Sequence, residues 1–347
     1  MIGASILWYL VQFALRVLRL RMAVIGIALF SLGLTSHAVQ GASFETWLDA
    51  LRDEARSIGI SEETVSEALQ GLAPNQRVIE LDRRQPEFTQ TLDEYLASRV
   101  SIARVREGQA KQAQHRVLLD ELEAKYGVPR RVMLAIWGME SGYGRQVGSF
   151  SVVRSLATLA WDERRSAFFR RELLAALRIA DSGDVALGAF HGSWAGALGQ
   201  PQLLPSVYVQ HAQDVDGDGR RDIWTSVPDT LGSIAEVMRA NGWKEGVPWG
   251  VAARVASDAE SLPEPNGRGC GAWQSHQGPT SISEWSRHGV VAPSRGLGSS
   301  ELATLLTLEN RHYLVTSSFE ALLGYNCSNA YALAVGLLAD GIASANP

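Results

Sequence analysis

The sequence is poor in cysteine, because only Cys270 and Cys327 occur among its 347 residues. This count excludes a disulfide-rich scaffold and a zinc site built from several cysteines. Neither cysteine lies near the N-terminus, so the chain offers no cysteine for lipid attachment behind an export signal. In an exported protein the two thiols can form one disulfide, and two buried free thiols are equally compatible with the sequence.

An excess of basic residues is also missing. The 32 Lys and Arg residues are outnumbered by 37 Asp and Glu residues, which leaves a formal net charge of -5 at pH 7. A nucleic-acid-binding surface is usually basic, so the charge gives no indication of such a partner. Hydrophobic residues make up 46% of the chain and charged residues 20%, a balance that favours folded cores over long disorder. The length fits two or three domains.

The N-terminal segment has the pattern of an export signal. Two apolar runs, Ile2–Leu15 and Met22–Leu34, are separated by three arginines. Basic residues, a short apolar run and the small residues of Ser36-His37-Ala38 predict a signal peptide over residues 1–38. An uncleaved membrane anchor is the alternative, but the second run is short for a span and arginines interrupt the longer one. If translation starts at Met22, only the second run belongs to the protein.

One carboxylate interrupts an apolar helical pattern. Pro129 suits the first turn of a helix, and the apolar spacing that follows it reaches Glu140 at the next buried position. Gly142 and Gly144 end the helix and allow a tight turn. Burial raises the pKa of a carboxyl group, and a glycosidase needs a protonated carboxylic acid near neutral pH. The alternative is a buried structural glutamate that pairs with an arginine or caps a loop.

An acidic segment has the spacing of a calcium loop. Residues 214–222 read DVDGDGRRD, with acids at positions one, three and five and glycine at six, as in an EF-hand. Position twelve is Thr225, so Asp229 is the nearest acid that can close the site. The predicted ligands are Asp214, Asp216, Asp218, the backbone carbonyl of Arg220, Asp222 and Asp229. Such close carboxylates repel one another without a cation, and an all-protein oxygen cage favours calcium over magnesium. The alternative is a solvated acidic turn.

Two further segments are candidates for ligand contact. Gly192–Gln202 is rich in small residues that allow close backbone approach, with Ser193 and Gln202 as hydrogen-bonding side chains. The alternative for this segment is close packing without a ligand. Tyr325–Tyr331 places aromatic and amide side chains before an apolar helix, as a sugar-binding cleft does. Here the alternative is ordinary helix capping by Ser328 or Asn329.

Apolar residues follow helical spacing over most of the chain. The sequence shows no internal repeat. The pattern predicts helices over Ser43–Leu72 with a break at residues 58–60, Phe88–Val105, Gln109–Tyr126 and Phe168–Ala180. Residues Asn75–Pro86 are polar and predicted to be a connection. Val247–Leu297 is rich in Gly, Pro and Ser, which predicts loops with short strands, and Glu301–Ile342 returns to helical spacing.

Five ordered motifs together resemble the MltB-type lytic murein transglycosylases, glycoside hydrolase family 103. They are AIWGMESGYG, SLATLAWDERRSAFFRREL, GSWAGALGQPQLLPS, DVDGDGRRDIW and YNCSNAYALAVGLLAD, and they span about Phe44 to Ile342. The resemblance implies a mainly α (α+β) fold: a lysozyme-like core, an additional helical domain and a small β-containing domain. The expected parts are an N-terminal helical region (39–104), a catalytic core (105–250), a loop or β region (251–300) and a C-terminal helical part that completes the cleft (301–347).

The resemblance also implies roles for individual residues. Glu140 aligns with the sole catalytic acid, and the acidic loop aligns with a structural calcium site. The cleft residues that it implies are Arg164, Arg165, Ser193, Gln202, Tyr325, Asn326 and Tyr331. The sequence departs from the family at Val237, where relatives usually have a cleft tyrosine. This departure concerns one substrate contact and not the reaction class.

The implied reaction is cleavage of the β-1,4 bond between N-acetylmuramic acid and N-acetylglucosamine in peptidoglycan, with a 1,6-anhydromuramyl product. Glu140 acts first as acid and then as base, so one carboxylate suffices where ordinary glycosidases use a pair. A lysozyme-type hydrolase and a non-catalytic peptidoglycan-binding scaffold are the alternatives. The implied location is the periplasm and the implied partner is the glycan strand. Cell-wall synthesis or secretion complexes are further candidate partners that the sequence does not identify.

Overall fold

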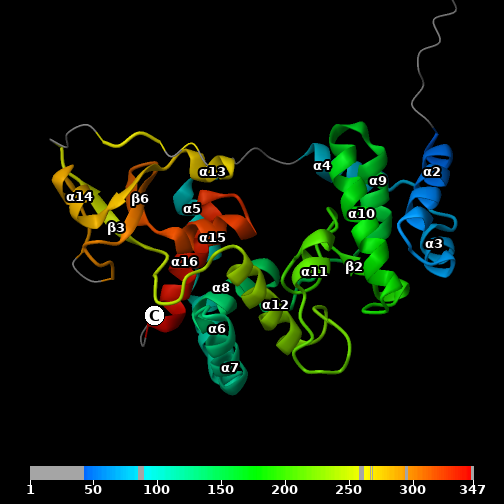
Figure 1. The fold of residues 1–347 in the computed structure, drawn as a ribbon, viewed down its shortest axis with the longest axis horizontal. Coiled ribbons are helices and arrows are strands. Elements are labelled where there is room, and N and C mark those ends of the chain that lie inside the picture. The colour runs from blue at the N-terminus through cyan, green and yellow to red at the C-terminus, as the bar shows by residue number, and fades with distance from the viewer. Residues whose placement is uncertain are drawn as a thin grey trace, which may run out of the picture. The chain divides into compact units, whose positions relative to one another are not determined.

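The computed structural model describes residues 43–84, 90–257, 262–265, 267, 269–293 and 296–344. These residues form mostly helices together with a small antiparallel sheet, which confirms the predicted class (Figure 1). The predicted signal peptide, residues 1–38, lies outside the described residues. Within the described part, no single helix has both the length and the apolar composition needed to cross a membrane. Helices α15 (Ser317–Tyr325) and α16 (Asn329–Ala343) reach this length and composition only as a pair, bent by 114°.

The described chain begins with three short helices: α2 (Phe44–Ser57), α3 (Glu62–Leu69) and α4 (Gln76–Arg83). Ser61 caps α3, because its side chain accepts a hydrogen bond from the N–H of Thr64. The predicted connection over Asn75–Pro86 is wrong. Asn75 caps α4 by accepting from the N–H of Arg77, and the buried side chains of this short helix pack it against the protein.

Three helices occupy the region where the sequence predicts two longer ones: α5 (Leu92–Arg99), α6 (Ile102–Gln114) and α7 (Arg116–Tyr126). The prediction of two continuous helices is therefore wrong, because each of them is broken at one position. Val100 and His115 both have non-helical backbone angles, and Ser101 caps α6 by accepting from the N–H of Arg104. These breaks redirect the chain so that α6 contacts both α8 (Arg130–Ser141) and α16 (Asn329–Ala343).

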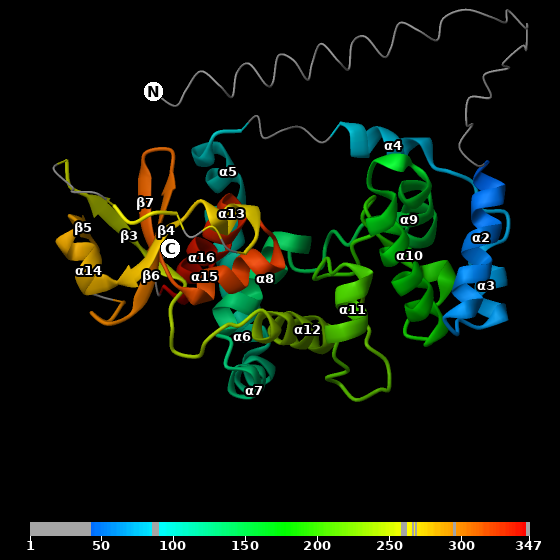
Figure 2. The ribbon, with the colours of Figure 1, turned by 45° about the horizontal axis from the view of Figure 1, so that its top comes forward.

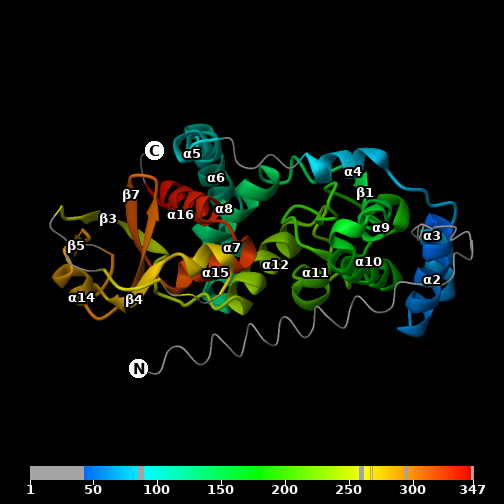
Figure 3. The ribbon, with the colours of Figure 1, turned by 90° about the horizontal axis from the view of Figure 1, so that it is seen from above.

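The largest core surrounds α8, which contacts α6, α7, α12 (Val227–Ala240) and α16. Eight consecutive residues of α8, from Val132 to Met139, are buried. Helix α15 (Ser317–Tyr325) packs against α12 and α16, and Figure 3 shows α16 beside α8. A helix surrounded in this way is apolar on all faces, which explains the dense apolar run before Glu140.

A second core forms around α9 (Val152–Trp161), α10 (Ser166–Asp181) and α11 (Pro205–His211). Helices α9 and α10 lie side by side, and α3 packs on α10 (Figures 1 and 2). The short strands β1 (Phe150–Ser151) and β2 (His191–Gly192) pair antiparallel next to α9. Val237 of α12 belongs to this second core, whereas Ile234 of the same helix belongs to the first. Tyr325 packs against both cores, so α12 and the end of α15 lie where the two cores meet.

The sheet has five antiparallel strands in the order β4-β6-β7-β3-β5. The strands are β3 (Gly250–Val255), β4 (Gln277–Ser281), β5 (Val290–Val291), β6 (Leu302–Leu308) and β7 (Arg311–Val315), with short helices α13 (Gly271–Gln274) and α14 (Ile282–Arg287) between them. Short strands within Val247–Leu297 agree with the prediction. The helical prediction from Glu301 onward is wrong up to Val315, because a short apolar run has no periodicity that separates a strand from a helix. Helices resume only at α15.

Candidate active site

Glu140 lies in the last turn of α8, where the chain leaves the core. Gly142 adopts a left-handed conformation with φ of 58° and ends the helix, as predicted. Gly144 is also required, since a Cβ atom at this position would collide with the side-chain oxygen of Gln200. Gln200 in turn accepts a hydrogen bond from the indole N–H of Trp137 at 2.8 Å. The loop after α8 is therefore held against the segment Gly192–Gln202.

The Glu140 carboxyl group has one hydrogen-bond donor in the described structure. The hydroxyl of Tyr331, in the first turn of α16, donates to Oε1 at 2.5 Å. Burial raises the pKa of Glu140 from its ordinary 4.5 to about 7, while the Tyr331 hydrogen bond and the charge of Arg99 act in the opposite direction. A carboxyl group with this pKa exists in both protonation states near neutral pH, so it can give and take a proton.

Tyrosines surround this carboxyl group. Burial and the negative charge of Glu140 raise the pKa of both Tyr325 and Tyr331 well above the usual value, so both remain neutral hydroxyls. The hydroxyl of Tyr325 donates to the carbonyl of Pro201 at 2.6 Å. The structure thus brings Tyr325 and Tyr331, two residues predicted to lie in one cleft, to the same carboxylate.

Sequence reasoning missed a contribution from α5. Arg99 acts electrostatically on Glu140, and its guanidinium lies 5.5 Å from the centre of the Tyr95 ring. Burial raises the pKa of Tyr95, and the charge of Glu140 acts in the same direction. The α5 sequence LDEYLASR has no unusual spacing, and its buried residues are Leu92 and Leu96. Only the packing of α5 on α16 brings Tyr95 and Arg99 to the site, so no local signal predicted them.

The Gly192–Gln202 segment uses its polar side chains mainly to hold its own shape. The hydroxyl oxygen of Ser193 accepts from the N–H of Ala197 at 2.9 Å. Gln202 has a positive φ of 51° and donates to the carbonyls of Gly199 at 2.7 Å and Val147 at 3.2 Å. The segment therefore approaches the end of α8 closely, as its small residues predict.

A cavity of about 330 Å³ opens beside Tyr325. Its lining contains Gln202 and Tyr325 together with Val237 of α12, and the remaining lining residues are Leu203, Leu204, Val207, Gln210, His211, Asn241 and Gly324. The position that departs from the family pattern thus forms one wall of a cavity shared with two predicted cleft residues. Asn326 follows Tyr325 directly and is exposed.

The two predicted cleft arginines have a structural partner. Arg164 donates from Nε to Oδ2 of Asp82 at 2.9 Å, and Arg165 hydrogen-bonds to the other oxygen of this carboxylate. Burial acts to raise the pKa of Asp82, but the two arginines outweigh it and hold the pKa below the ordinary value. Their side chains are about half exposed, at 50% and 41%. The described contacts link them to α4 and not to Glu140.

The acidic loop gathers three of its predicted ligands. Carboxylate oxygens of Asp214, Asp216 and Asp229 lie within 4.8 Å of one another, so these residues fit a single cation. Asp218 and Asp222 lie outside this group of oxygens. Asp218 accepts from the N–H of Arg220, and Asp222 accepts from the N–H groups of residues 224 and 225.

The sequence is compatible with a disulfide and with two free thiols, and the structure contains the disulfide. Cys270 and Cys327 are joined, with their Cα atoms 6.1 Å apart. The bond connects the start of α13 to the turn between α15 and α16.

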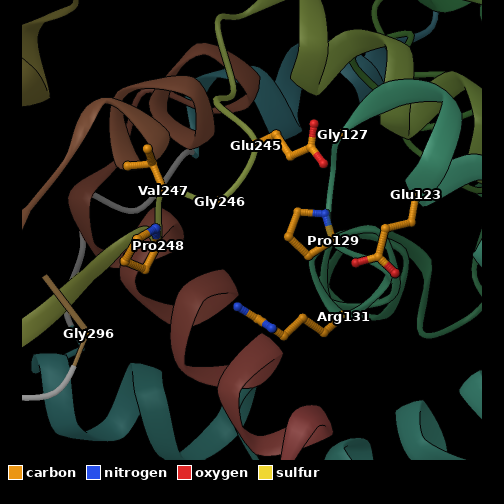
Figure 4. A pocket seen from close by; sticks show the side chains of 9 residues that line it. All are labelled: Glu123, Gly127, Pro129, Arg131, Glu245, Gly246, Val247, Pro248 and Gly296. Carbon is orange, nitrogen blue, oxygen red and sulfur yellow. The ribbon is translucent and has the colours of Figure 1, made fainter.

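A second cavity, of about 460 Å³, lies at the opposite end of α8 (Figure 4). Glu123, Arg131 and Glu245 point charged side chains around it. Arg131 and Glu140 are nine residues apart on one helix, roughly 14 Å at the usual rise per residue. This cavity is therefore separate from the Glu140 site.

This chain is similar to several known proteins. The family model described as a transglycosylase SLT domain matches residues 43–340. The membrane-bound lytic murein transglycosylase B of Escherichia coli K12 is 34% identical over 226 residues, which cover 63% of this chain and 58% of that protein. This chain thus spans less than two thirds of that relative.

Two solved structures are similar over most of the chain. Pseudomonas aeruginosa SltB3, in complex with NAG-anhNAM-pentapeptide, is 44% identical with a TM-score of 0.80 and covers 88% of this chain and 80% of its own. The Escherichia coli lytic transglycosylase Slt35, in complex with calcium, is 28% identical with a TM-score of 0.72, over 85% of this chain and 92% of its own. With its family model matched from residue 43 to residue 340, this chain belongs to the transglycosylase SLT domain family.

Proposed function

We propose that this protein is a lytic transglycosylase that cleaves the β-1,4 bond between N-acetylmuramic acid and N-acetylglucosamine in peptidoglycan. The observation that carries the proposal is the carboxyl group of Glu140 at the end of α8, whose removal from water raises its pKa to about 7 beside a cluster of tyrosines. Family membership supports it, and so does the SltB3 complex with a peptidoglycan fragment.

In the first step, protonated Glu140 donates its proton to the glycosidic oxygen. The bond from that oxygen to the anomeric carbon of the muramic ring breaks, and N-acetylglucosamine leaves as an alcohol. The muramic ring becomes oxocarbenium-like, assisted by its own acetamido group. The Tyr331 hydroxyl stabilises the carboxylate that remains on Glu140, because a hydrogen bond to the charged form favours that form.

In the second step, the Glu140 carboxylate takes the proton of the muramic 6-hydroxyl. The 6-oxygen attacks the anomeric carbon and forms the 1,6-anhydro ring, which returns Glu140 to its protonated form without consuming water. The charged and titratable groups that act on Glu140 in the described structure are Tyr331 and Arg99, not a second carboxylate. This arrangement suits a reaction in which one residue is acid and base in turn.

The glycan strand is proposed to bind along the residues that line the site. Tyr325, Tyr331 and Gln202 flank Glu140 and the adjacent cavity, and Ser193 and Asn326 belong to the neighbouring segments. Arg164 and Arg165 extend the proposed cleft with partly exposed guanidinium groups held by Asp82. Tyrosine rings suit pyranose faces, and amides suit sugar hydroxyls.

A structural calcium ion is proposed in the acidic loop. Its core ligands are Asp214, Asp216 and Asp229, whose oxygens already converge. Calcium takes six to eight oxygen ligands, so Asp218, Asp222 and the carbonyl of Arg220 complete the proposed set. The calcium complex of the relative Slt35 supports this assignment. The carboxylates of this loop would be held by the ion, so its role is structural and not catalytic.

We further propose export of the mature chain to the periplasm, where peptidoglycan glycan strands are its substrate. The N-terminal pattern over residues 1–38 supports export.

Product analysis on purified sacculi tests the reaction. Mass spectrometry should find muropeptides with 1,6-anhydromuramyl ends, lighter by one water than the products of hydrolysis. Reducing muramyl ends would identify a lysozyme-type hydrolase instead. Sacculus binding without any soluble product would identify a non-catalytic scaffold.

A further inference from the structure

A buried histidine connects the sheet to the helix that carries Tyr331. His276 is fully buried between α13 and β4. Its Nδ1 lies 3.2 Å from the hydroxyl of Thr304 in β6, and its Nε2 lies 2.8 Å from Oδ1 of Asn329, the first residue of α16. Asn329 is two residues before Tyr331, so this chain of polar contacts ends next to the hydroxyl that binds Glu140.

The donors and acceptors in this chain are mutually consistent. The side-chain NH₂ of Asn329 donates to the carbonyl of Ala272 at 3.1 Å, which leaves its oxygen facing His276. His276 therefore donates from Nε2–H, and its Nδ1 accepts from the hydroxyl of Thr304. Burial lowers the pKa of His276, which keeps the neutral ring that this pattern needs. The rings of Trp273 and Phe319, centred 4.7 Å and 5.8 Å away, restrict its orientation.

The disulfide is attached to the same turn. Cys327 lies between Tyr325 and Tyr331, and its bond to Cys270 anchors the turn to α13. The backbone N–H of Ala272 also points to the sulfur of Cys327, at 3.5 Å. Helix α13 thus holds the turn at two positions, Cys327 and Asn329, and each is two residues from a tyrosine of the site.

We propose that His276 and the Cys270–Cys327 disulfide are positioning residues that hold Tyr331 at hydrogen-bonding distance from Glu140 during proton transfer. The proposal rests on the proposed function, because it assigns a role in proton transfer by Glu140. Neither His276 nor the disulfide touches Glu140. Their effect is to restrict the α15–α16 turn, so that the Tyr331 hydroxyl remains in place when the carboxylate forms.

Loosening of the α15–α16 turn should have a distinctive effect on the pH profile of the reaction rate. The groups that face Glu140 are Tyr331 from α16, Tyr325 from α15, and Tyr95 and Arg99 from α5. Of these, Tyr331 is the one that follows Asn329 in the first turn of α16. Its hydrogen bond favours the ionised carboxylate, so its loss raises the pKa of Glu140 and moves the alkaline limb of the rate profile upward.

The test measures anhydromuropeptide release against pH for His276→Gln, for the double variant Cys270→Ser/Cys327→Ser, and for Tyr331→Phe alone and combined with each. His312→Gln is the matched control, because His312 makes a similar contact with Thr307, at 3.1 Å, but lies on β7. We expect kcat to fall roughly 10-fold in His276→Gln and in the double variant, with KM little changed. The alkaline limb of the rate profile should move up by about half a pH unit in both variants. Adding Tyr331→Phe to either of them should lower kcat further by less than about 2-fold.

Three outcomes would overturn the positioning role: unchanged pH limbs, effects that multiply with those of Tyr331→Phe, or an equal loss in His312→Gln. Melting temperatures are recorded so that release is expressed per folded molecule. If His276→Gln does not fold, anhydromuropeptide release is measured instead on the folded wild-type protein after its disulfide has been reduced. The double serine variant, which has no disulfide to reduce, is the control for the reductant. Near-normal release by Glu140→Gln would instead overturn the proposed function and this inference together.

Discussion

The end of α8 and the acidic site formed by residues 214–222 and the first turn of α12 both contain carboxyl groups held partly out of water, yet their surroundings differ. Glu140 receives one hydroxyl donor, from Tyr331. Asp229 is fully buried, and burial raises its pKa, but its two oxygens accept hydrogen bonds from the backbone N–H groups of Val215 and Asp222 at 2.7 Å and 2.8 Å. It also lies next to further carboxylates. A lone carboxyl with few donors suits proton transfer, whereas clustered carboxylates suit a cation.

The largest expected effect tests the proton-transfer half of this comparison. Glu140→Gln keeps the shape of the side chain but removes its transferable proton, so release of anhydromuropeptides should fall ~10²–10⁴-fold or more. The variant should fold and still bind sacculi.

Glu172→Gln is the matched control for that variant. Glu172 is a buried glutamate of α10, and its two oxygens accept from the N–H and the hydroxyl of Ser206, each at 2.9 Å. This change should lower the melting temperature and leave release per folded molecule intact. Equal activity losses in both variants would show that Glu140 is structural.

The pH dependence of stability is the next largest effect. The pKa of Glu140 is about 7 in the folded protein and 4.5 ordinarily, so its contribution to stability is fully present below pH 4.5 and is lost as pH rises to about 7. The free energy of unfolding should decrease by up to about 3 kcal/mol through this window. Denaturant unfolding of Glu140→Gln should lack this decrease. A decrease of the same size in the variant would contradict the assignment.

Calcium removal tests the other half of the comparison. Calcium at ~100 times its Kd should raise the free energy of unfolding by ~2.7 kcal/mol, since the ion binds only the folded loop. Melting curves of metal-free protein should therefore rise on addition of calcium, and magnesium should have a smaller effect. Asp229→Asn should abolish the response. Identical curves with calcium and with chelator would argue against the site.

The smallest expected effect concerns the single donor to Glu140. Tyr331→Phe removes one hydrogen bond to a charged group, worth roughly 1.5 kcal/mol, and should lower kcat roughly 10-fold. Because this bond lowers the pKa of Glu140, its loss should shift the alkaline limb of the kcat profile to higher pH. An unshifted limb would show that Tyr331 does not act on the reacting carboxyl.

Local patterns predicted much of the fold and part of the site. Residues close in sequence predicted the helix that carries Glu140 in its last turn. They also predicted the convergence of Asp214, Asp216 and Asp229. The β6–β7 hairpin could not be separated from a helix, because its short apolar run carries no helical or strand periodicity. The polar stretch before Pro86 contains a helix with only two buried apolar side chains, Val78 and Ile79.

The sequence by itself determined which residues can do chemistry here: one glutamate where an apolar helix expects a core residue, and a series of aspartates at calcium-loop spacing. Tertiary structure alone decided their surroundings. It placed Tyr331 and Arg99 near Glu140, paired Arg164 and Arg165 with Asp82, and joined Cys270 to Cys327. The physical reason is that the pKa and partners of a side chain depend on groups within a few ångströms, and those groups come from helices far apart in the chain.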